Sequence, residues 1–254
     1  MSKLILIGAG PGDPELITLK AVRYLHQADV ILYDALANEA LLEHASRARV
    51  KRFVGKRFGC HELSQAEIND LIIDYGRQYD HIIRLKGGDP YVFGRATEEM
   101  AAAASAGMTV EVVPGISSAL AVPASCMIPV TSRGTSESFW VITGTNRNGN
   151  ISNDISLAAQ STATVIILMA MSKLEQIMDI FIQYGKADTA AAVIQNGTTP
   201  DARIVTGKVK DICYRAQHAG MGNPAVIVIG EVVNLHHGLQ QQMAGITHLS
   251  NIAY

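Results

Sequence analysis

Short apolar runs bounded by glycine or polar residues alternate with amphipathic stretches through the first 113 residues of the chain. The runs predict buried strands at 4–7, 30–33, 50–54, 81–85 and 110–113. Helices are expected between them at 14–27, 64–75 and 97–106. Asp13 is the expected N-cap of the first helix, and Ser64 with Glu67 forms a capping box for the second. This alternation predicts a parallel sheet with helices on both faces.

The pattern changes at Pro114, where residues 114–134 are rich in proline, glycine, serine and threonine and predict a connection containing a short helix. Beyond it, strands are expected at 139–143, 164–169, 191–194, 204–209 and 225–229. Helices are expected at 172–184, opened by a Ser172–Glu175 capping box, and near 211–218, while 146–155 is read as an exposed loop. Two adjacent strands joined around 196–207 predict a hairpin and therefore a mixed sheet. We expect two α/β domains, 1–116 and 117–239, followed by a polar tail at 240–254.

Composition narrows the classes of function. The 254 residues are 48% hydrophobic, which excludes a mainly disordered chain, and 21 Lys and Arg against 23 Asp and Glu leave no basic field for nucleic acid or a membrane surface. The cysteines, Cys60, Cys126 and Cys213, form no closely spaced pair, so we expect reduced thiols in the cytoplasm and no metal site. No window reaches 18 apolar residues, and the N-terminus lacks the pattern of a signal peptide, so no membrane span is expected.

A glycine-rich loop, Gly8 to Pro14, follows the first predicted strand and invites a dinucleotide-binding interpretation, with Asp34 24 residues beyond Gly10. Two details argue against that interpretation. Asp13 stands where the motif needs its third glycine and would repel a pyrophosphate, and Pro11 removes an amide donor. A purely structural turn remains the other alternative.

Two further clusters follow predicted strands: Gly87, Gly88 and Asp89 after the fourth, and the segment 114–118 after the fifth. Paired glycines allow a ligand to approach the backbone closely, although Ser117 alone could be a helix cap. Because parallel strands end at one edge of a sheet, the three loops are expected to meet there. Their coincidence predicts a ligand-binding cleft.

Taken together, these motifs resemble the tetrapyrrole methylase family. The resemblance covers about residues 3–235 and rests on GAGPGDPELIT (8–18), ADVILYDAL (28–36), RLKGGDPYVFGR (84–95), VPGISSA (113–119), IPVTSRG (128–134), NGTTPDARIVTGKV (196–209) and NPAVIVIGEVV (223–233). VGKRFGCHELSQAEIN (54–69) is more specific to the members that act on uroporphyrinogen III. One departure is Ser132, where the family usually has histidine.

The resemblance implies two α/β domains with the active site in the cleft between them, in a homodimer. It implies methyl transfer from S-adenosyl-L-methionine to two carbons of uroporphyrinogen III, giving precorrin-2 and S-adenosyl-L-homocysteine. A methyltransferase acting on a later precorrin of cobalamin synthesis is the alternative. A nicotinamide-dependent oxidoreductase and a non-catalytic or RNA-directed member of the fold are more distant ones.

The family pattern also implies roles for individual residues. The cofactor is expected to contact Pro11, Gly87, Gly88, Asp89, Val92, Ser117, Ser118, Met169 and Gly197. Asp34 is the implied proton acceptor and Lys56 the donor, and the tetrapyrrole is expected to contact Arg95, Glu98, Arg133 and His61. A cationic sulfonium favours a carboxylate such as Asp89 nearby, and a substrate with many carboxylates suits basic residues, namely Lys56, Arg57, His61, Arg84, Lys86, Arg95 and Arg133. The structural alternatives are a turn residue for Asp34, a solvated pair for Lys56 and Arg57, a surface or structural histidine for His61 and a core residue for Met169.

Overall fold

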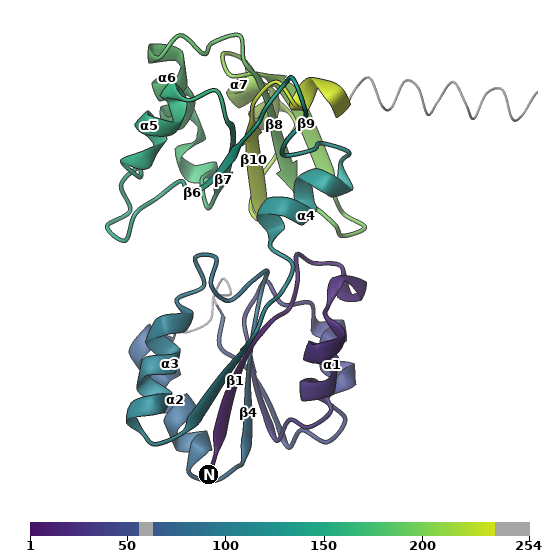
Figure 1. Cartoon of the computed structure of the whole chain (residues 1–254), viewed down its shortest axis with the longest axis vertical. Coiled ribbons are helices and arrows are strands. Elements are labelled where there is room, and N and C mark those ends of the chain that lie inside the picture. Colours follow the sequence, from purple (N-terminus) through teal and green to yellow (C-terminus); the bar gives the residue numbers. More distant parts are fainter. Residues whose placement is uncertain (56–62, 237–254) are drawn as a thin grey trace, which may run out of the picture. The chain divides into compact units, whose positions relative to one another are not determined.

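A computed structural model of the chain describes residues 1–55 and 63–236. The chain divides into two compact units, the first spanning Met1–Ser118 and the second beginning at Ala119. Each unit contains one five-stranded sheet covered by helices, so the predicted fold class of two α/β sheets is confirmed (Figure 1).

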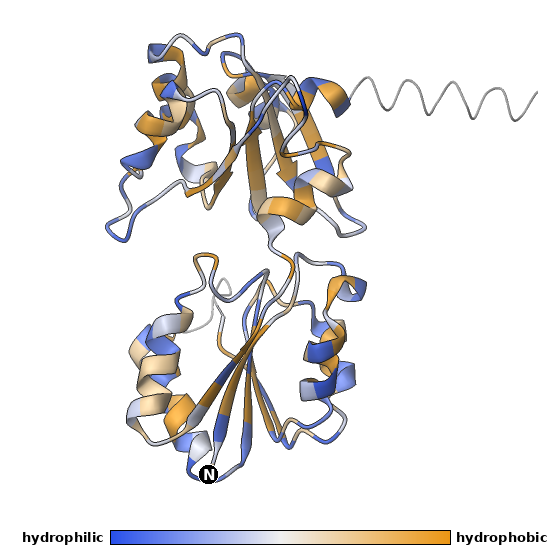
Figure 2. Cartoon of the chain, in the orientation of Figure 1, coloured by the Kyte–Doolittle hydropathy of each residue, from blue (hydrophilic) through white to orange (hydrophobic). Residues whose placement is uncertain are grey.

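The sheet of the first unit is entirely parallel, in the order β3-β2-β4-β1-β5. Its strands are β1 (Lys3–Gly8), β2 (Val30–Tyr33), β3 (Val50–Phe53), β4 (His81–Lys86) and β5 (Thr109–Val113). The central strands β1, β2 and β4 are mostly buried and mostly apolar, as expected for a sheet covered on both sides, with Arg84 and Lys86 of β4 as buried charged exceptions. Figure 2 shows this as hydrophobic colouring along the strands.

Helices cover both faces of this sheet. α1 (Leu19–Leu25) packs on one face, and α2 (Gln65–Gly76) and α3 (Ala96–Ser105) pack on the other. The predicted capping box of α2 is present, because the Ser64 hydroxyl accepts from the Glu67 amide and the Glu67 carboxylate accepts from the Ser64 amide. Since all five strands run in one direction, every strand-end loop that follows them lies at one edge of the sheet.

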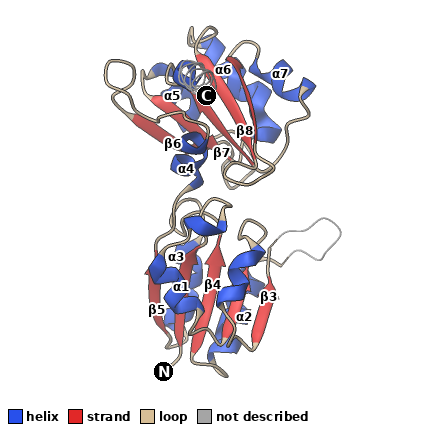
Figure 3. Ribbon diagram, turned by 90° about the vertical axis from the view of Figure 1, so that its right-hand side faces the viewer, coloured by secondary structure: helices blue, strands red, loops and turns tan. Residues whose placement is uncertain are grey.

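The second unit has a mixed sheet in the order β6-β7-β10-β8-β9. Figure 3 labels β6, β7 and β8 of this sheet. Its strands are β6 (Phe139–Thr143), β7 (Thr164–Leu168), β8 (Ala190–Gln195), β9 (Arg203–Lys208) and β10 (Ala225–Ile229). Strands β6 and β7 are parallel, whereas the other pairs are antiparallel, and β8 with β9 forms the predicted hairpin.

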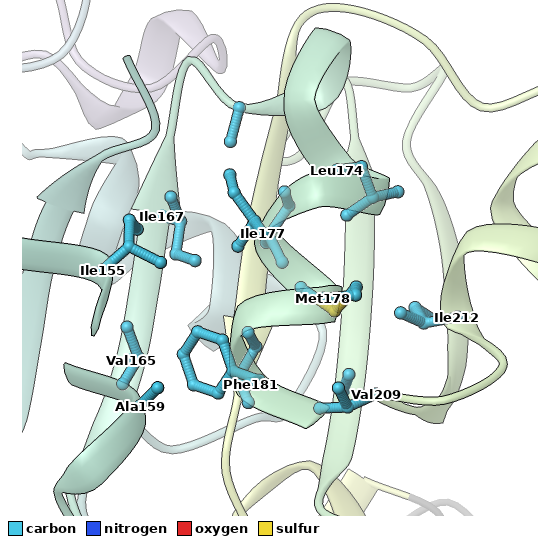
Figure 4. Packing of buried hydrophobic residues seen from close by; sticks show 14 of the residues in the cluster. Ile155, Ala159, Val165, Ile167, Leu174, Ile177, Met178, Phe181, Val209 and Ile212 are labelled. Carbon is cyan, nitrogen blue, oxygen red and sulfur yellow. The ribbon is translucent and has the colours of Figure 1, made fainter. Parts of the chain in front are cut away.

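One face of the second sheet packs against α5 (Asp154–Gln160), α6 (Leu174–Gln183) and α7 (Ile212–His218), and the other packs against α4 (Ser118–Ser125). Figure 4 shows the first of these cores, in which Phe181 of α6 lies near Val165 and Ala159. The buried members of this core are aliphatic side chains together with Met178 and Phe181.

Three local predictions were wrong. The stretch 14–27 is two elements, the 3-10 helix η1 (Pro14–Leu16) and then α1, because Ile17 is extended and the Thr18 hydroxyl accepts from the Ala21 amide to begin a new helix. The Ser172–Glu175 capping box does not form, since Ser172 lies inside the 3-10 helix η3 (Met171–Lys173) that precedes α6. The end of the predicted 146–155 loop is instead the start of α5.

The connections also contain the 3-10 helix η2 (Glu39–His44), which the hydrophobic pattern did not predict. Among the described residues, no helix has both the length and the apolar character that crossing a membrane requires.

Candidate active site

Three glycine loops meet at the carboxyl edge of the first sheet, as their positions after β1, β4 and β5 predict. Gly10 and Gly88 exchange two backbone hydrogen bonds, of 3.2 Å and 2.7 Å. A Cβ added to Gly8 would lie 2.5 Å from the backbone of Gly115, so these loops approach more closely than any side chain allows. The loops therefore form one continuous backbone surface, which we call the glycine cradle (Gly8–Gly12, Gly87–Asp89 and Gly115–Ser118).

Asp89 ties this surface together. One carboxylate oxygen accepts from the Gly115 amide at 3.0 Å, and the other accepts from the Tyr91 amide at 2.8 Å. The side chain therefore joins the loop after β4 to the loop after β5 and places one negative charge in a half-buried position beside the glycines. Val92 belongs to the same turn, since its amide donates to the Asp89 carbonyl at 3.1 Å.

The cradle has an open side. Gly88 has a φ of +65°, and a Cβ built there would meet only one atom within 4 Å, the Ser118 amide nitrogen at 3.7 Å. Open space therefore lies beside the Cα atom of Gly88, whereas Gly8 and Gly115 pack directly against each other. A cationic ligand in this space would suit the neighbouring Asp89 carboxylate.

Beside the cradle lies a buried group of four charged side chains, which we call the Glu99 cluster (Asp34, Arg84, Lys86 and Glu99). Glu99 of α3 is completely buried and accepts from Arg84 Nε at 3.0 Å and from Lys86 Nζ at 3.0 and 3.1 Å. Arg84 and Lys86 of β4 are also buried, with side chains 4% and 6% exposed. Two carboxylates and two cations thus balance each other within the cluster.

Asp34 is the one member of the cluster that reaches solvent. It follows β2, its side chain is 26% exposed, and Oδ2 accepts from the Arg84 guanidinium at 3.2 Å. Oδ1 accepts from the Gly87 amide at 3.3 Å, so Asp34 also contacts the glycine cradle. A Cβ on Gly87 would clash with Leu36, which explains why glycine follows β4 at this point. Asp34 is therefore held on both carboxylate oxygens.

Burial dominates the titration of Lys86. Desolvation and the neighbouring positive charge of Arg84 lower the pKa of Lys86, and the attraction of Glu99 offsets only part of that effect. The interpretation of Arg84 and Lys86 as contacts for substrate carboxylates does not fit, because both side chains are enclosed and paired with Glu99. Sequence reasoning missed Glu99 altogether. The signal was present, since two cations spaced for one face of a buried strand require a buried carboxylate.

Arg95, Glu98 and Arg133, three of the predicted substrate residues, lie in more exposed positions. Arg95, at the N-cap of α3, has a φ of +55° and donates to both oxygens of Glu98 at 2.7 Å. This pairing lowers the pKa of Glu98. Arg133 is exposed in the segment before β6. Lys56 and His61, with Arg57, lie outside the described residues.

The second unit brings Met169 and Gly197 to one edge of its sheet. They follow β7 and β8, which both pair antiparallel with β10 and therefore run in the same direction. Met169 has a φ of +55° and is 52% exposed, so it is not a core residue. Gly197 is buried against Val122 of α4, where a Cβ would clash. Pro11 is half-buried in the first loop of the cradle.

Within residues 1–55 and 63–236, no group of three or more His, Cys, Asp or Glu side chains has an arrangement suited to a metal ion. Cys126 and Cys213 are free thiols, and burial raises the pKa of both.

Comparison with known proteins defines the class. The family described as Tetrapyrrole (Corrin/Porphyrin) Methylases matches residues 3–213, and the chain belongs to this family. A uroporphyrinogen-III C-methyltransferase of Methanocaldococcus jannaschii is 41% identical over 235 residues, 92% of this chain and 97% of that protein. An S-adenosyl-L-methionine-dependent uroporphyrinogen III methyltransferase of Methanosarcina barkeri is also 41% identical, over 96% of this chain and 97% of that protein.

Solved structures agree in fold. A uroporphyrin-III C-methyl transferase from Thermus thermophilus, complexed with S-adenyl homocysteine, is similar with a TM-score of 0.78 and 34% sequence identity. The similarity covers 92% of this chain and 100% of that one.

Proposed function

We propose that this chain transfers methyl groups from S-adenosyl-L-methionine to two ring carbons of uroporphyrinogen III, giving precorrin-2. One observation carries the proposal: the chain is 41% identical, over nearly its full length, to a uroporphyrinogen-III C-methyltransferase. The glycine cradle and Asp34 lie together at one sheet edge, which supports it. A later precorrin as substrate is less well supported, because the two relatives described above are named for uroporphyrinogen III.

When bound, the cofactor supplies an electrophilic methyl group, whose bond to sulfur breaks with the electron pair remaining on sulfur as a new bond to a pyrrole carbon forms. In the proposed site, the residues of the cradle bind and orient: Pro11, Gly87, Gly88, Asp89, Val92, Ser117 and Ser118. The Asp89 carboxylate provides a negative charge toward a cationic ligand. Met169 and Gly197 are also proposed to contact the cofactor.

Methylation gives the tetrapyrrole a positive charge that it relieves by losing a proton. Asp34 is the proposed acceptor, since its carboxylate is partly exposed at the sheet edge and is fixed by Arg84 and the Gly87 amide. Lys56 is the proposed donor. No strong nucleophile is needed from the protein, so alignment and exclusion of water are expected to provide much of the rate.

Arg95, Glu98, Arg133 and His61 are proposed to contact the tetrapyrrole. Arg95 already makes a two-pronged hydrogen bond with Glu98. A substrate carboxylate would bind by sharing or displacing that contact, because guanidinium groups suit bidentate carboxylates. Because the Arg95–Glu98 pair is exposed to solvent, breaking it to bind a substrate carboxylate costs little free energy.

The test is incubation of the purified chain with uroporphyrinogen III and methyl-labelled S-adenosyl-L-methionine, with the products read by mass. Two labelled methyl groups per tetrapyrrole are expected. No labelled product from uroporphyrinogen III, with transfer to a later precorrin instead, would overturn the proposal. Calorimetry of Asp89→Ala should show loss of cofactor binding, and unchanged affinity would remove Asp89 from the site.

A homodimer and a cytoplasmic location complete the proposal. The family resemblance supports the dimer, and the cysteine pattern supports a reducing compartment. Light scattering at micromolar concentration should give twice the mass of one chain, and a particle with the mass of a single chain would contradict the dimer.

A further inference from the structure

We infer that Glu99 is a positioning residue for Asp34, acting through Arg84 and balanced by Lys86. This inference rests on the proposed function, in which Asp34 accepts the proton released after methyl transfer. Glu99 lies within α3 and is completely buried, so it reaches neither solvent nor a bound substrate directly. Its effect on the reaction must pass through the cations that it holds.

The contacts leave Arg84 little freedom. Nε donates to Glu99 at 3.0 Å, and one terminal nitrogen donates to the carbonyls of Leu32 and Leu85 at 3.3 and 3.1 Å. The other terminal nitrogen donates to Asp34 at 3.2 Å. A planar guanidinium held from three sides presents its last edge in one direction, so Glu99 contributes to the position of the Asp34 carboxylate.

The same residues also determine the electrostatic environment of Asp34. In the part of the chain that the structure describes, the charged groups recorded around Asp34 are Arg84 and Lys86 of β4 and Glu99 of α3. The four formal charges sum to zero. Removing the negative charge of Glu99 would leave an excess cation beside Asp34 and favour its ionised form, whereas removing the positive charge of Lys86 would favour its protonated form.

A purely structural role makes a different prediction. If the cluster only stabilises the fold, then disrupting it from either side would lower the amount of active protein and leave the pH dependence of the remainder unchanged. If the cluster sets the proton affinity of Asp34, then Glu99→Gln and Lys86→Met would shift that dependence in opposite directions. Opposite shifts from two variants of one cluster distinguish the two roles.

The experiment compares Glu99→Gln, Lys86→Met and the double variant, which restores the charge balance and keeps side chains of similar size. The acid limb of kcat reports protonation of the proposed proton acceptor. The acid limb should move down by about one pH unit in Glu99→Gln and up by about one unit in Lys86→Met. In the double variant it should return close to the wild-type position.

A second readout needs no substrate. The ¹³C carboxyl resonance of Asp34, identified by its loss in Asp34→Asn, is titrated in the ligand-free full chain and its variants. The same opposite shifts are expected. Glu111→Gln is the matched control, because Glu111 also bridges two cations in the first unit and belongs to no proposed site. It should leave the Asp34 titration unchanged.

The outcomes separate the two proposals. If the wild-type chain does not methylate uroporphyrinogen III but the Asp34 resonance shifts as described, only the proposed function fails. If the chain methylates its substrate and both single variants leave the titration in place, or shift it in one direction, the role of Glu99 is overturned. Where a single variant does not fold, the resonance in the double variant and the other single variant decides: an identical titration in both rejects the inference.

Discussion

Two carboxylates of the first unit bridge two cations each, on opposite faces of one sheet, yet they differ in kind. Glu99 joins Arg84 and Lys86 on the face covered by α2 and α3, without any exposure to solvent. Glu111 of β5 belongs to what we call the Glu111 cluster (Lys3, Lys20, Tyr24 and Glu111), on the face covered by α1, where its side chain is 24% exposed. Burial is the main difference between them.

The lysines show what burial changes. In the Glu111 cluster, the hydrogen bond from each lysine to the carboxylate raises the pKa of Lys3 and of Lys20. In the Glu99 cluster, desolvation outweighs the same attraction and lowers the pKa of Lys86. An ion pair at the surface is therefore a modest stabilising contact, whereas the enclosed cluster depends on every member keeping its partner.

The largest effect is expected from a substitution that tests whether Asp34, the partly exposed member of the Glu99 cluster, accepts a proton in the reaction. Asp34→Asn should lower kcat by about 10² to 10⁴, or roughly 3–5 kcal/mol in activation free energy, since it removes the proposed proton acceptor but keeps a similar shape. The Kd for S-adenosyl-L-methionine should stay within a few-fold of the wild-type value. The measurement is kcat together with the cofactor Kd. A fall in kcat of less than tenfold, in folded protein, would make Asp34 structural.

The second largest effect is expected on the free energy of unfolding, when the Glu99 cluster is disrupted. Glu99→Leu leaves Arg84 and Lys86 without their shared carboxylate, and we expect the free energy of unfolding to fall by about 3 kcal/mol. Urea unfolding followed by far-UV circular dichroism measures the change. Trp140, the single tryptophan of the chain, lies on β6, so its fluorescence reports separately on the second unit. A loss below about 1 kcal/mol would mean that Leu packs as well as the cluster does.

The Glu111 cluster should respond more weakly and with a defined pH dependence. Hydrogen bonds from Lys20, Lys3 and Tyr24 lower the pKa of Glu111 from 4.5 to about 2. Ionised Glu111 therefore stabilises the fold above pH 4.5, and this contribution is lost as pH falls from 4.5 toward 2. Glu111→Gln should cost about 1 kcal/mol at pH 7, because solvent screens the half-exposed Lys20. The difference from wild type, in urea unfolding at several pH values, should shrink across that range. A constant difference would contradict this account.

The smallest effect extends the series to the second unit. Asp188 accepts from Lys208 and Lys210 at 2.9 and 2.8 Å, and both lysines lower its pKa to about 2. Its side chain is 69% exposed, so water replaces the two contacts with little loss. Asp188→Asn should leave the thermal unfolding midpoint unchanged within error. A clear decrease would show that exposure does not decide the strength of these carboxylate bridges.

Predictions from the sequence succeeded where a local pattern determines the outcome. The apolar runs of β2, β6 and β10 predicted the observed bounds, and the Ser64–Glu67 capping box formed as expected. The three glycine loops meet at one sheet edge because the direction of parallel strands requires it. Such features depend on residues close in sequence or on topology alone.

Predictions from the sequence failed where two local signals compete, or where a residue's interaction partner is distant in the sequence. Thr18 and Asp13 are both good N-caps, and nothing in the pattern shows that each begins its own helix. Glu99 reads as an ordinary acidic residue in the first turn of a helix, and only the fold brings it to Arg84, 15 positions away. Buried charge pairing is therefore the part of the candidate site that required the structure.

The mutual contact of Gly8, Gly88 and Gly115 has an energetic consequence for ligand binding. Because the three backbones are already in contact, folding itself has restricted the loops, and binding needs little further ordering of them. Alanine at Gly8 or Gly115 would force the loops apart without touching the ligand. Affinity at the proposed cofactor site would therefore come from main chain that is already ordered by the folding of the first unit.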